Sequence, residues 1–191
     1  MSANETIAVR VLDSAVSHDA RLVDQLTGLI NGVYATAESG LWRDGTTRTT
    51  ASELGELIAA GQIAVATRDG HIAGAVRIHD VADDASEFGM LVAASDQRST
   101  GVGRALLAFA EQHSRERGLR AMQLELLVPR TWRHPSKEFL KAWYGRSGYR
   151  LIRTTTIDDA HPHLAPMLAT PCDVEVHEKP LQADGLASSP P

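Results

Sequence analysis

The segment Gln97–Arg104, Gln-Arg-Ser-Thr-Gly-Val-Gly-Arg, has the composition of a phosphate-binding turn. It follows an apolar run at 88–93 and precedes an amphipathic stretch, so we expect it to join a strand to a helix. The first backbone N–H groups of a helix lack intrahelical partners, and with the positive end of the helix dipole they form an anion site. Gly101 and Gly103 carry no Cβ, which lets a ligand approach the main chain closely.

Two common phosphate-binding motifs do not fit this segment. A P-loop needs Gly-Lys-Ser/Thr and a Rossmann fingerprint needs Gly-x-Gly-x-x-Gly, and neither spacing occurs here. The pattern Arg-x-x-Gly-x-Gly between a strand and a helix instead resembles the acyl-coenzyme-A signature of the GNAT superfamily of N-acyltransferases. An ordinary strand-to-helix loop is the alternative interpretation of so short a pattern.

The resemblance implies that acetyl-CoA is the co-substrate and indicates which residues bind it. Main-chain groups of Leu91, Val92 and Ala93 would pair with the pantetheine arm, which lies between two diverging parallel strands. The glycine turn would hold the pyrophosphate through Arg98, Ser99, Thr100, Gly101, Val102, Gly103 and Arg104.

Three residues depart from the common family pattern. Ser95 and Ser99 replace a frequent proline and glycine, and Lys137 stands where an asparagine often contacts the cofactor. Backbone donors survive changes of side chain, so the phosphate site is still expected, but the asparagine contact is not.

The block 139–149, Phe-Leu-Lys-Ala-Trp-Tyr-Gly-Arg-Ser-Gly-Tyr, resembles the family's helix that ends in an aromatic pair followed by a glycine and an aromatic residue. In many members a tyrosine at the place of Tyr144 returns a proton to the thiolate of coenzyme A, so the resemblance implies that Tyr144 is the catalytic acid. The alternative is that Tyr144 fills the core beside Trp143.

A primary amine must lose a proton before it attacks a thioester, so a base is expected. Glu87 is the first candidate, because it opens the strand that leads to the glycine turn and matches the base position of several family members. Glu125, among apolar neighbours, is the second. Either could equally be a solvent-facing or salt-bridged carboxylate.

Candidate acceptor-binding residues come from two segments. Arg130 and Arg133, in a connection rich in Arg, Trp and His, could hold a carboxylate or phosphate of the acceptor, or belong to a solvated loop. Tyr34 and Glu38, late in the first expected helix, could form the other wall of the site, together with Asn31 and Trp42, or could serve packing.

Other reactive side chains give weaker signals. His161, His163 and His177 include a His-x-His pair, but no completing Cys or carboxylate spacing indicates zinc, so no metal is expected. Cys172 is interpreted as a small apolar residue. No nucleophile-elbow context occurs, which favours direct transfer without an acyl-enzyme.

Apolar spacing and turn chemistry predict the elements that would position these residues. The expected order is strand 7–12, helix 22–33, helix 51–60 with a capping box at Thr50 and Glu53, hairpin 63–79 turning on Asp69-Gly70, polar loop 81–86, strand 88–93, helix 102–118, strand 122–128, helix 137–147, and strands 149–157 and 173–177. This predicts a mixed α/β (α+β mixed sheet) class, and it matches the GNAT order, which implies a central sheet flanked by helices with a splayed parallel strand pair. Residues 1–182 are expected to form one domain, and 183–191 a disordered tail.

Composition limits the function classes. The 191 residues carry a net charge of −5, which argues against nucleic acid as a partner, and a single cysteine excludes an intrachain disulfide. The start is polar and no apolar run is long enough to span a bilayer, so neither a membrane nor secretion is expected, and a cytoplasmic location is the default.

These observations predict an acetyl-CoA-dependent N-acetyltransferase whose acceptor is a small-molecule or peptide amine. A non-catalytic acyl-CoA sensor with the same fold is the alternative. The acceptor's identity, the acyl chain length and the oligomeric state stay open, a homodimer among them.

Overall fold

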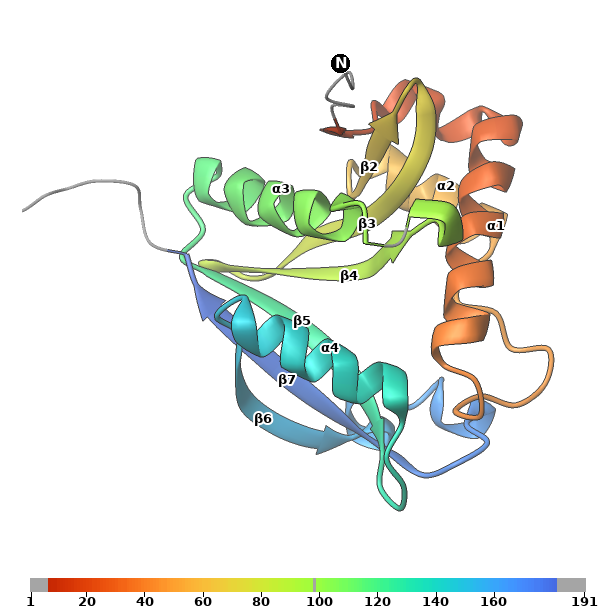
Figure 1. Cartoon of the computed structure of the whole chain (residues 1–191), viewed down its shortest axis with the longest axis vertical. Coiled ribbons are helices and arrows are strands. Elements are labelled where there is room, and N and C mark those ends of the chain that lie inside the picture. Colours follow the sequence, from red (N-terminus) through yellow and green to blue (C-terminus); the bar gives the residue numbers. More distant parts are fainter. Residues whose placement is uncertain (1–6, 98, 182–191) are drawn as a thin grey trace, which may run out of the picture.

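The computed structural model describes residues 7–97 and 99–181. They form one seven-stranded mixed sheet of order β1-β2-β3-β4-β5-β7-β6, with helices on both faces (Figure 1). The pair β4 and β5 is parallel and the other neighbouring pairs are antiparallel. This confirms the predicted fold class. The elements are β1 (Ala8–Val11), α1 (Ala20–Ala37), α2 (Ala51–Ala59), β2 (Ile63–Arg68), β3 (His71–Ala82), β4 (Ala85–Ala93), α3 (Val102–Glu116), β5 (Ala121–Pro129), α4 (Pro135–Arg146), β6 (Arg150–Thr156), α5 (Ile157–Ala160) and β7 (Cys172–Pro180).

Each face of the sheet has its own apolar core. On one face α1 and α2 pack on β2, β3 and β4, through Leu26, Ile30, Leu54, Ile58, Val65 and Val92. On the other face α3 and α4 pack through Leu106, Leu107, Phe88, Met122, Leu124 and Tyr144. Residues on the two faces of one strand therefore meet different helices.

Local polar side chains begin the first two long helices. Asp19 caps α1 by accepting the Leu22 N–H at 3.1 Å, and Thr50 caps α2 by accepting the Glu53 N–H at 3.2 Å. The expected helix after Thr50 is confirmed, but the capping box is incomplete, because the Glu53 side chain does not bond back to the Thr50 N–H. The Glu53 carboxylate accepts a hydrogen bond from the hydroxyl of Thr49 at 2.9 Å.

The hairpin between β2 and β3 turns on Asp69 and Gly70 as predicted. Their φ angles of 52° and 77° are those of a turn with two left-handed residues, which matches the twist of the flanking strands. The expected polar loop over 81–86 is wrong, because β3 runs to Ala82 and β4 begins at Ala85. Ser86 is fully buried and shares a 2.7 Å hydrogen bond with Ser114 of α3, so a polar residue here belongs to a strand.

A β-bulge interrupts β4 at Met90. Ala75 pairs with Val92 and Arg77 with Gly89, so β4 has one residue more than β3 between these pairs, and Met90 has φ 48°. The extra residue reverses the alternation of side chains. Phe88 faces α3 and α4, whereas Met90 and Val92 face α1 and α2.

The two parallel strands separate just before this bulge. Pairing joins β4 to β5 at Ala85, Ser86 and Glu87 and then stops, and the ribbons diverge toward α1 in Figure 1. From Phe88 to Ala93, the edge of β4 that faces β5 has no strand partner within the described chain. The predicted splayed pair is therefore present.

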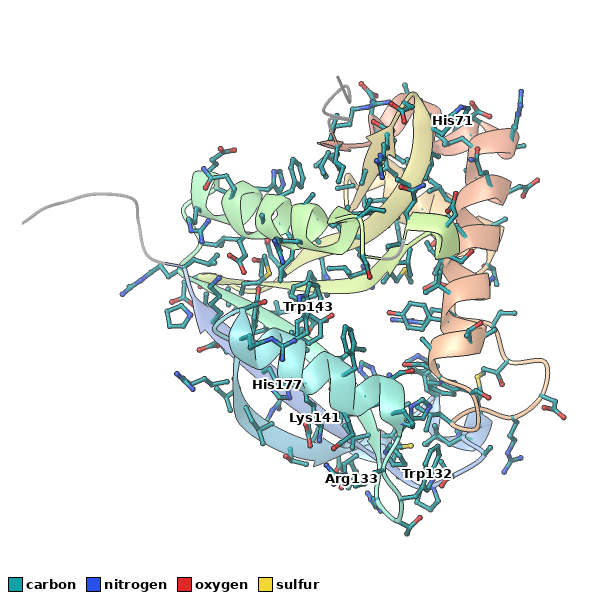
Figure 2. The ribbon with its side chains drawn as sticks, viewed as in Figure 1. His71, Trp132, Arg133, Lys141, Trp143 and His177 are labelled. Atoms are coloured by element: carbon teal, nitrogen blue, oxygen red, sulfur yellow. The ribbon has the colours of Figure 1, made fainter. Side chains whose placement is uncertain are left out.

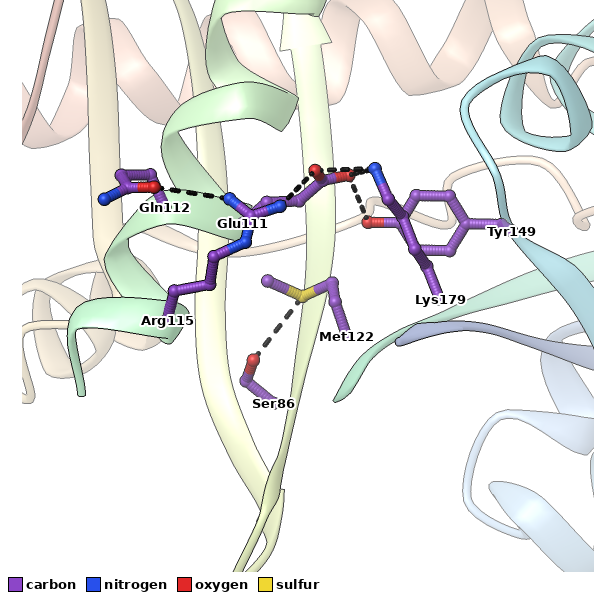
Figure 3. A network of polar contacts seen from close by, with 7 residues as sticks. All are labelled: Ser86, Glu111, Gln112, Arg115, Met122, Tyr149 and Lys179. Carbon is purple, nitrogen blue, oxygen red and sulfur yellow. Dashed lines mark hydrogen bonds and ion pairs between the residues drawn. The ribbon is translucent and has the colours of Figure 1, made fainter. Parts of the chain in front are cut away.

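A buried polar network ties the two halves of the sheet where β4 and β5 are still paired (Figure 3). The Glu111 carboxylate of α3 accepts hydrogen bonds from the Tyr149 hydroxyl at 3.1 Å and from Lys179 of β7 at 2.8 and 2.7 Å. Arg115 adds a weaker contact at 3.3 Å. Because Glu111 lies on the helix beside β4 and its partners lie beside β5, the network closes this end of the splay.

None of the described helices is both long and apolar enough to cross a bilayer. Between residues 7 and 181, Arg98 excepted, no group of three or more His, Cys, Asp or Glu side chains could hold a metal ion.

Candidate active site

The glycine turn is shaped by two left-handed residues. Ser99 has φ 64° and Gly101 has φ 96°, and Gly101 is the N-cap of α3, without a side-chain cap. Thr100 turns its hydroxyl back to donate to the Gln97 carbonyl at 2.7 Å. Arg98, expected to contact the pyrophosphate, lies outside the described residues.

The start of α3 presents unused backbone donors. The first helical hydrogen bond runs from Ala105 N–H to the Gly101 carbonyl at 2.9 Å. Within the described chain nothing accepts from the N–H groups of Gly103 and Arg104. The missing Cβ of Gly103 would lie 3.8 Å from the Trp143 ring and 3.9 Å from Leu91, and Figure 2 shows Trp143 between α3 and α4. The turn thus offers main chain, as an oxyanion ligand requires.

Leu91, Val92 and Ala93 lie on the unpaired stretch of β4, directly after the bulge. Val92 is 1% exposed and faces α1, while Leu91 faces α3 near Gly103. Among the residues that the structure describes, none pairs as a strand with the main-chain groups of this edge toward β5. This open edge is where the family resemblance places the pantetheine arm.

Tyr144 lies inside the aromatic cluster of the α3 and α4 face. Its ring centroid is 5.6 Å from Phe88, 4.9 Å from Trp143 and 6.0 Å from Tyr149, and the residue is 6% exposed. Burial, with a smaller contribution from Tyr34, raises the pKa of the Tyr144 hydroxyl well above its usual value. The hydroxyl therefore stays protonated at neutral pH, as a proton donor must.

One helical prediction next to Tyr144 is wrong. The spacing of Phe139, Leu140, Trp143 and Tyr144 predicts that all four lie on one side of the helix and are covered, but Phe139 is 64% exposed. One turn separates Phe139 from Trp143, so spacing alone does not distinguish them. Trp143 lies toward α3 in Figure 2 and packs against the core of that face, whereas Phe139 stays exposed.

Glu87 lies on the opposite face of the sheet, at the last paired position of β4. Its carboxylate is 3.9 Å from His79 of β3, and its side chain is 17% exposed. Burial raises the pKa of Glu87 to about 7. The neighbouring Glu125 carboxylate also raises this pKa, whereas the positive charges of Arg77, His161 and Arg48 lower it. A carboxylate with this pKa is half deprotonated at neutral pH, which suits a general base.

The second candidate base, Glu125, already has a partner. His161, from the β6–β7 connection, lies 2.5 Å from its carboxylate. The structure therefore makes Glu125 a neighbour that shifts the pKa of Glu87. His79 completes the group, and burial together with Arg77 lowers the pKa of its imidazole.

Glu38 and Lys137 form a buried ion pair, and the indole of Trp42 donates to the other Glu38 oxygen at 2.6 Å. Both oxygens of this expected acceptor-binding carboxylate are thus occupied by the protein. Lys137, at the position of the family's asparagine, is directed toward Glu38 and is 4% exposed.

The arginines of the connection before α4 are also paired. Arg130 donates to Asp173 at 2.7 Å, and Arg133, 85% exposed, pairs with Glu138. A cavity of about 480 Å³ lies under the β6–β7 connection, with Arg130 at its edge, and its lining includes Asp158 and Cys172. None of Glu87, Tyr144 and the glycine turn lines this cavity. Burial raises the pKa of Cys172 to about 11, so its thiol stays protonated.

Sequence reasoning missed Arg48 and Arg77. Arg48 approaches the ring of Tyr34, with its Cζ 5.2 Å from the centroid. Arg77 and His79 lie two residues apart on β3, so both side chains are on the same face of the sheet as Glu87. Charged residues two apart in an otherwise buried strand were the available signal. Arg48, in an irregular segment, gave none.

Comparison with known proteins gives one family match. The model of the Acetyltransferase (GNAT) family matches residues 33–145, more than half of the chain. No curated protein sequence matches.

Solved structures share the fold at low identity. The ribosomal-protein-alanine N-acetyltransferase of Brucella melitensis is 17% identical, with TM-score 0.65 over 91% of this chain and 99% of that one. Ard1 of Thermoplasma volcanium is 12% identical, with TM-score 0.64 over 92% and 98%. The yncA protein of Salmonella typhimurium, solved with its cofactor acetyl-CoA, is 13% identical, with TM-score 0.63 over 97% and 99%. At these low identities the comparison shows a shared fold alone.

Proposed function

Because this chain belongs to the acetyltransferase (GNAT) family, we propose that it moves an acetyl group from acetyl-CoA to a primary amine by direct attack on the thioester. The observation that supports this most is the place where β4 leaves β5. Glu87, whose pKa is raised, ends the paired stretch, and the next residue, Phe88, packs on the protonated Tyr144. The unpaired edge of β4 then begins, and its Leu91 lies beside Gly103, which carries an unused N–H donor at the start of α3.

The residues present fit the cofactor. The N–H groups of Gly103 and Arg104, at the positive end of α3, would hold the pyrophosphate, and the left-handed turn at Ser99 and Gly101 keeps side chains away from it. The open edge at 91–93 would pair with the pantetheine arm as a strand does. When bound, acetyl-CoA supplies the acyl group and the thiolate leaving group.

The protein moves protons on two faces of the sheet. Glu87, on the α1 face, takes a proton from the acceptor's ammonium group, directly or through water, and frees the nitrogen lone pair. The nitrogen forms a bond to the carbonyl carbon while the carbon–sulfur bond breaks. Tyr144, on the α3 and α4 face, donates its proton to the sulfur, and the second proton that the nitrogen loses as the amide forms replaces it through water. The products are an N-acetylated amine and free coenzyme A, and one proton passes to solvent.

Two further expectations belong to this proposal. One domain comprises residues 1–182, supported by the single sheet that runs through the described chain. The acceptor is a small molecule or a peptide with a primary amine, and the catalytic site needs no metal ion.

The experiment that tests the function follows thiol release from acetyl-CoA with a panel of amines. Acceptor-dependent turnover is expected, and Tyr144→Phe should lower kcat roughly 100-fold while leaving coenzyme A binding within a few-fold. Tyr149→Phe is the matched control, because it removes another buried hydroxyl of the same cluster without touching the reacting atoms. Tight coenzyme A binding without turnover on any amine would instead favour the sensor.

A further inference from the structure

Arg48 is a cation held at the site by neutral groups. Its guanidinium packs against the Tyr34 ring and interacts with the Tyr34 hydroxyl. The backbone of the next residue, Thr49, is fixed by Asn31, whose amide donates to the Thr49 carbonyl at 2.9 Å and accepts from the Thr49 N–H at 3.0 Å. Within the described chain no carboxylate forms an ion pair with Arg48. Most of its five N–H donors are thus left for another acceptor.

Arg77 is a second guanidinium at the same place. Its Nε donates to the neutral amide oxygen of Gln62 at 2.9 Å, and it lies opposite Gly89, the residue before the bulge. The hydroxyl of Tyr34 interacts with the backbone of Met90, which brings the Tyr34–Arg48 pair to the same bulge that Arg77 borders. Arg48 adds to the effect of burial in lowering the pKa of Arg77, as expected for neighbouring like charges.

The carboxylates near these guanidiniums each have another partner, and within the described chain none forms an ion pair with Arg48 or Arg77. Glu38 pairs with Lys137 and Glu125 with His161, and Glu53 accepts from Thr49. Glu87 is partly protonated near neutrality. Glu38, Glu53 and Glu87 thus attract the two guanidiniums without forming an ion pair with them in the described chain, which leaves N–H donors for an added carboxylate, and guanidiniums bind carboxylates bidentately.

We propose that the acceptor is a small amino acid-like molecule whose carboxylate binds Arg48 and Arg77, which places its amine at Glu87. This rests on the proposed function and names its substrate class. Glu87 lies diagonally from Arg77 on the same face of the β3–β4 pair, so an amine a few bonds from the bound carboxylate reaches it. Arg130 and Arg133, the arginines favoured by sequence, are less suited, because Asp173 and Glu138 already pair with them.

The experiment compares matched acceptors that differ by one charge. Thiol release from acetyl-CoA is measured with free amino acids and with their carboxamides, which keep the same amine and side chain. The native protein should prefer at least one acid over its amide by roughly 10- to 100-fold in kcat/KM. Arg48→Gln should remove that preference, mainly by raising KM for the acid, whereas Arg48→Lys should retain part of it.

Arg117→Gln is the control variant, since Arg117 pairs with Asp80 at the far end of α3 and should leave the preference unchanged. If amides are acetylated as well as acids throughout the panel, the carboxylate site is wrong and the acetyltransferase function stands. If coenzyme A binds but no amine is acetylated, both proposals fall. The acid-to-amide ratio of the native protein decides the question even if Arg48→Gln does not fold.

Discussion

Glu38, at the end of α1, and Lys137, in the first turn of α4, form a buried ion pair between helices on opposite faces of the sheet. At the other end of the splay, Glu111 binds Tyr149 and Lys179. The gap between β4 and β5 is therefore fixed at both ends by carboxylates. Such an arrangement supports the strand edges at both ends of the gap without a covalent link.

The Glu38–Lys137 pair gives a prediction for stability. Lys137→Met should lower the free energy of unfolding by about 3–5 kcal/mol, because it leaves a buried carboxylate without its cation. Glu38→Gln combined with Lys137→Met should recover most of the loss. Urea denaturation measures both. Lys141→Met, at the more exposed pair with Glu175, is the control and should cost only about 0–1 kcal/mol. Equal losses at the two lysines would contradict the prediction.

The raised pKa of Glu87 predicts the pH dependence of activity. A base acts when deprotonated, so kcat/KM should rise with pH through an apparent pKa of about 7. Glu125→Gln removes a neighbouring negative charge and should move this limb to lower pH. Glu87→Gln should abolish the limb and lower activity roughly 100-fold. A limb that persists in Glu87→Gln would assign it to another group, with His79 and His161 the nearest candidates.

The raised pKa of Glu87 also predicts how stability depends on pH: activity should rise with pH, whereas the contribution of Glu87 to stability should fall. Its pKa in the folded protein lies above the unfolded value of 4.5, so its contribution is fully present below pH 4.5 and is lost as the pH rises through about 7. Glu87→Gln should therefore raise the unfolding free energy at pH 8 by about 1–3 kcal/mol relative to the native protein and have little effect at pH 4.5. Thermal melts at the two pH values measure the difference, and identical shifts at both would count against burial of the charge.

The glycine turn gives a prediction for cofactor affinity. Gly101 has φ 96°, so Gly101→Ala should strain the turn by about 1–2 kcal/mol and weaken coenzyme A binding roughly tenfold, measured by calorimetry. Gly28→Ala is the matched control. Gly28 lies within α1 with open space around it, so alanine there should stabilise the helix by about 0.5–1 kcal/mol and leave affinity unchanged. Undiminished affinity in Gly101→Ala would exclude this turn as the phosphate site.

Gly74 permits the close packing of α3 on β3. A Cβ at this position would lie 2.5 Å from the Val92 carbonyl oxygen and 2.8 Å from Val102, at the start of α3. Gly74→Ala should cost about 1–3 kcal/mol and also weaken coenzyme A binding, because the displaced helix start carries the donors. Gly61→Ala, at a φ of 68° with open space around it, tests whether strain alone explains the loss. It should lower stability while leaving binding intact.

The sequence predicted the elements that local chemistry specifies. The Asp69-Gly70 turn, the Thr50 cap and the glycine turn before α3 depend on residues within a few positions of one another, and each forms where expected. The splayed parallel pair came from the family resemblance.

The rest depends on segments far apart in the chain. Arg48 and Arg77 meet because α1, its following loop and two strands converge at Met90, and no spacing in the sequence encodes that. The bulge follows Gly89, and a glycine inside a strand often marks a bulge, but this signal alone does not specify which residue is extra. Phe139 satisfies helical periodicity but lacks a neighbour to cover it.

The bulge also determines how substitutions along β4 should be interpreted. A scan of this strand with charged residues should show greater tolerance at the odd-numbered positions 87, 89, 91 and 93, which are the less buried ones on both sides of Met90, although the face that they occupy changes there. An aspartate in place of Leu91 would lie on the α3 and α4 face, beside the proposed cofactor site. An aspartate in place of Glu87, also an odd-numbered position, would stay on the α1 face, beside the proposed acceptor site. Deletion of residue 89 or 90 would remove the bulge, so each later residue of β4 would move to the opposite face of the sheet. Side chains that now lie beside the acetyl donor would then lie beside the acceptor, and the reverse.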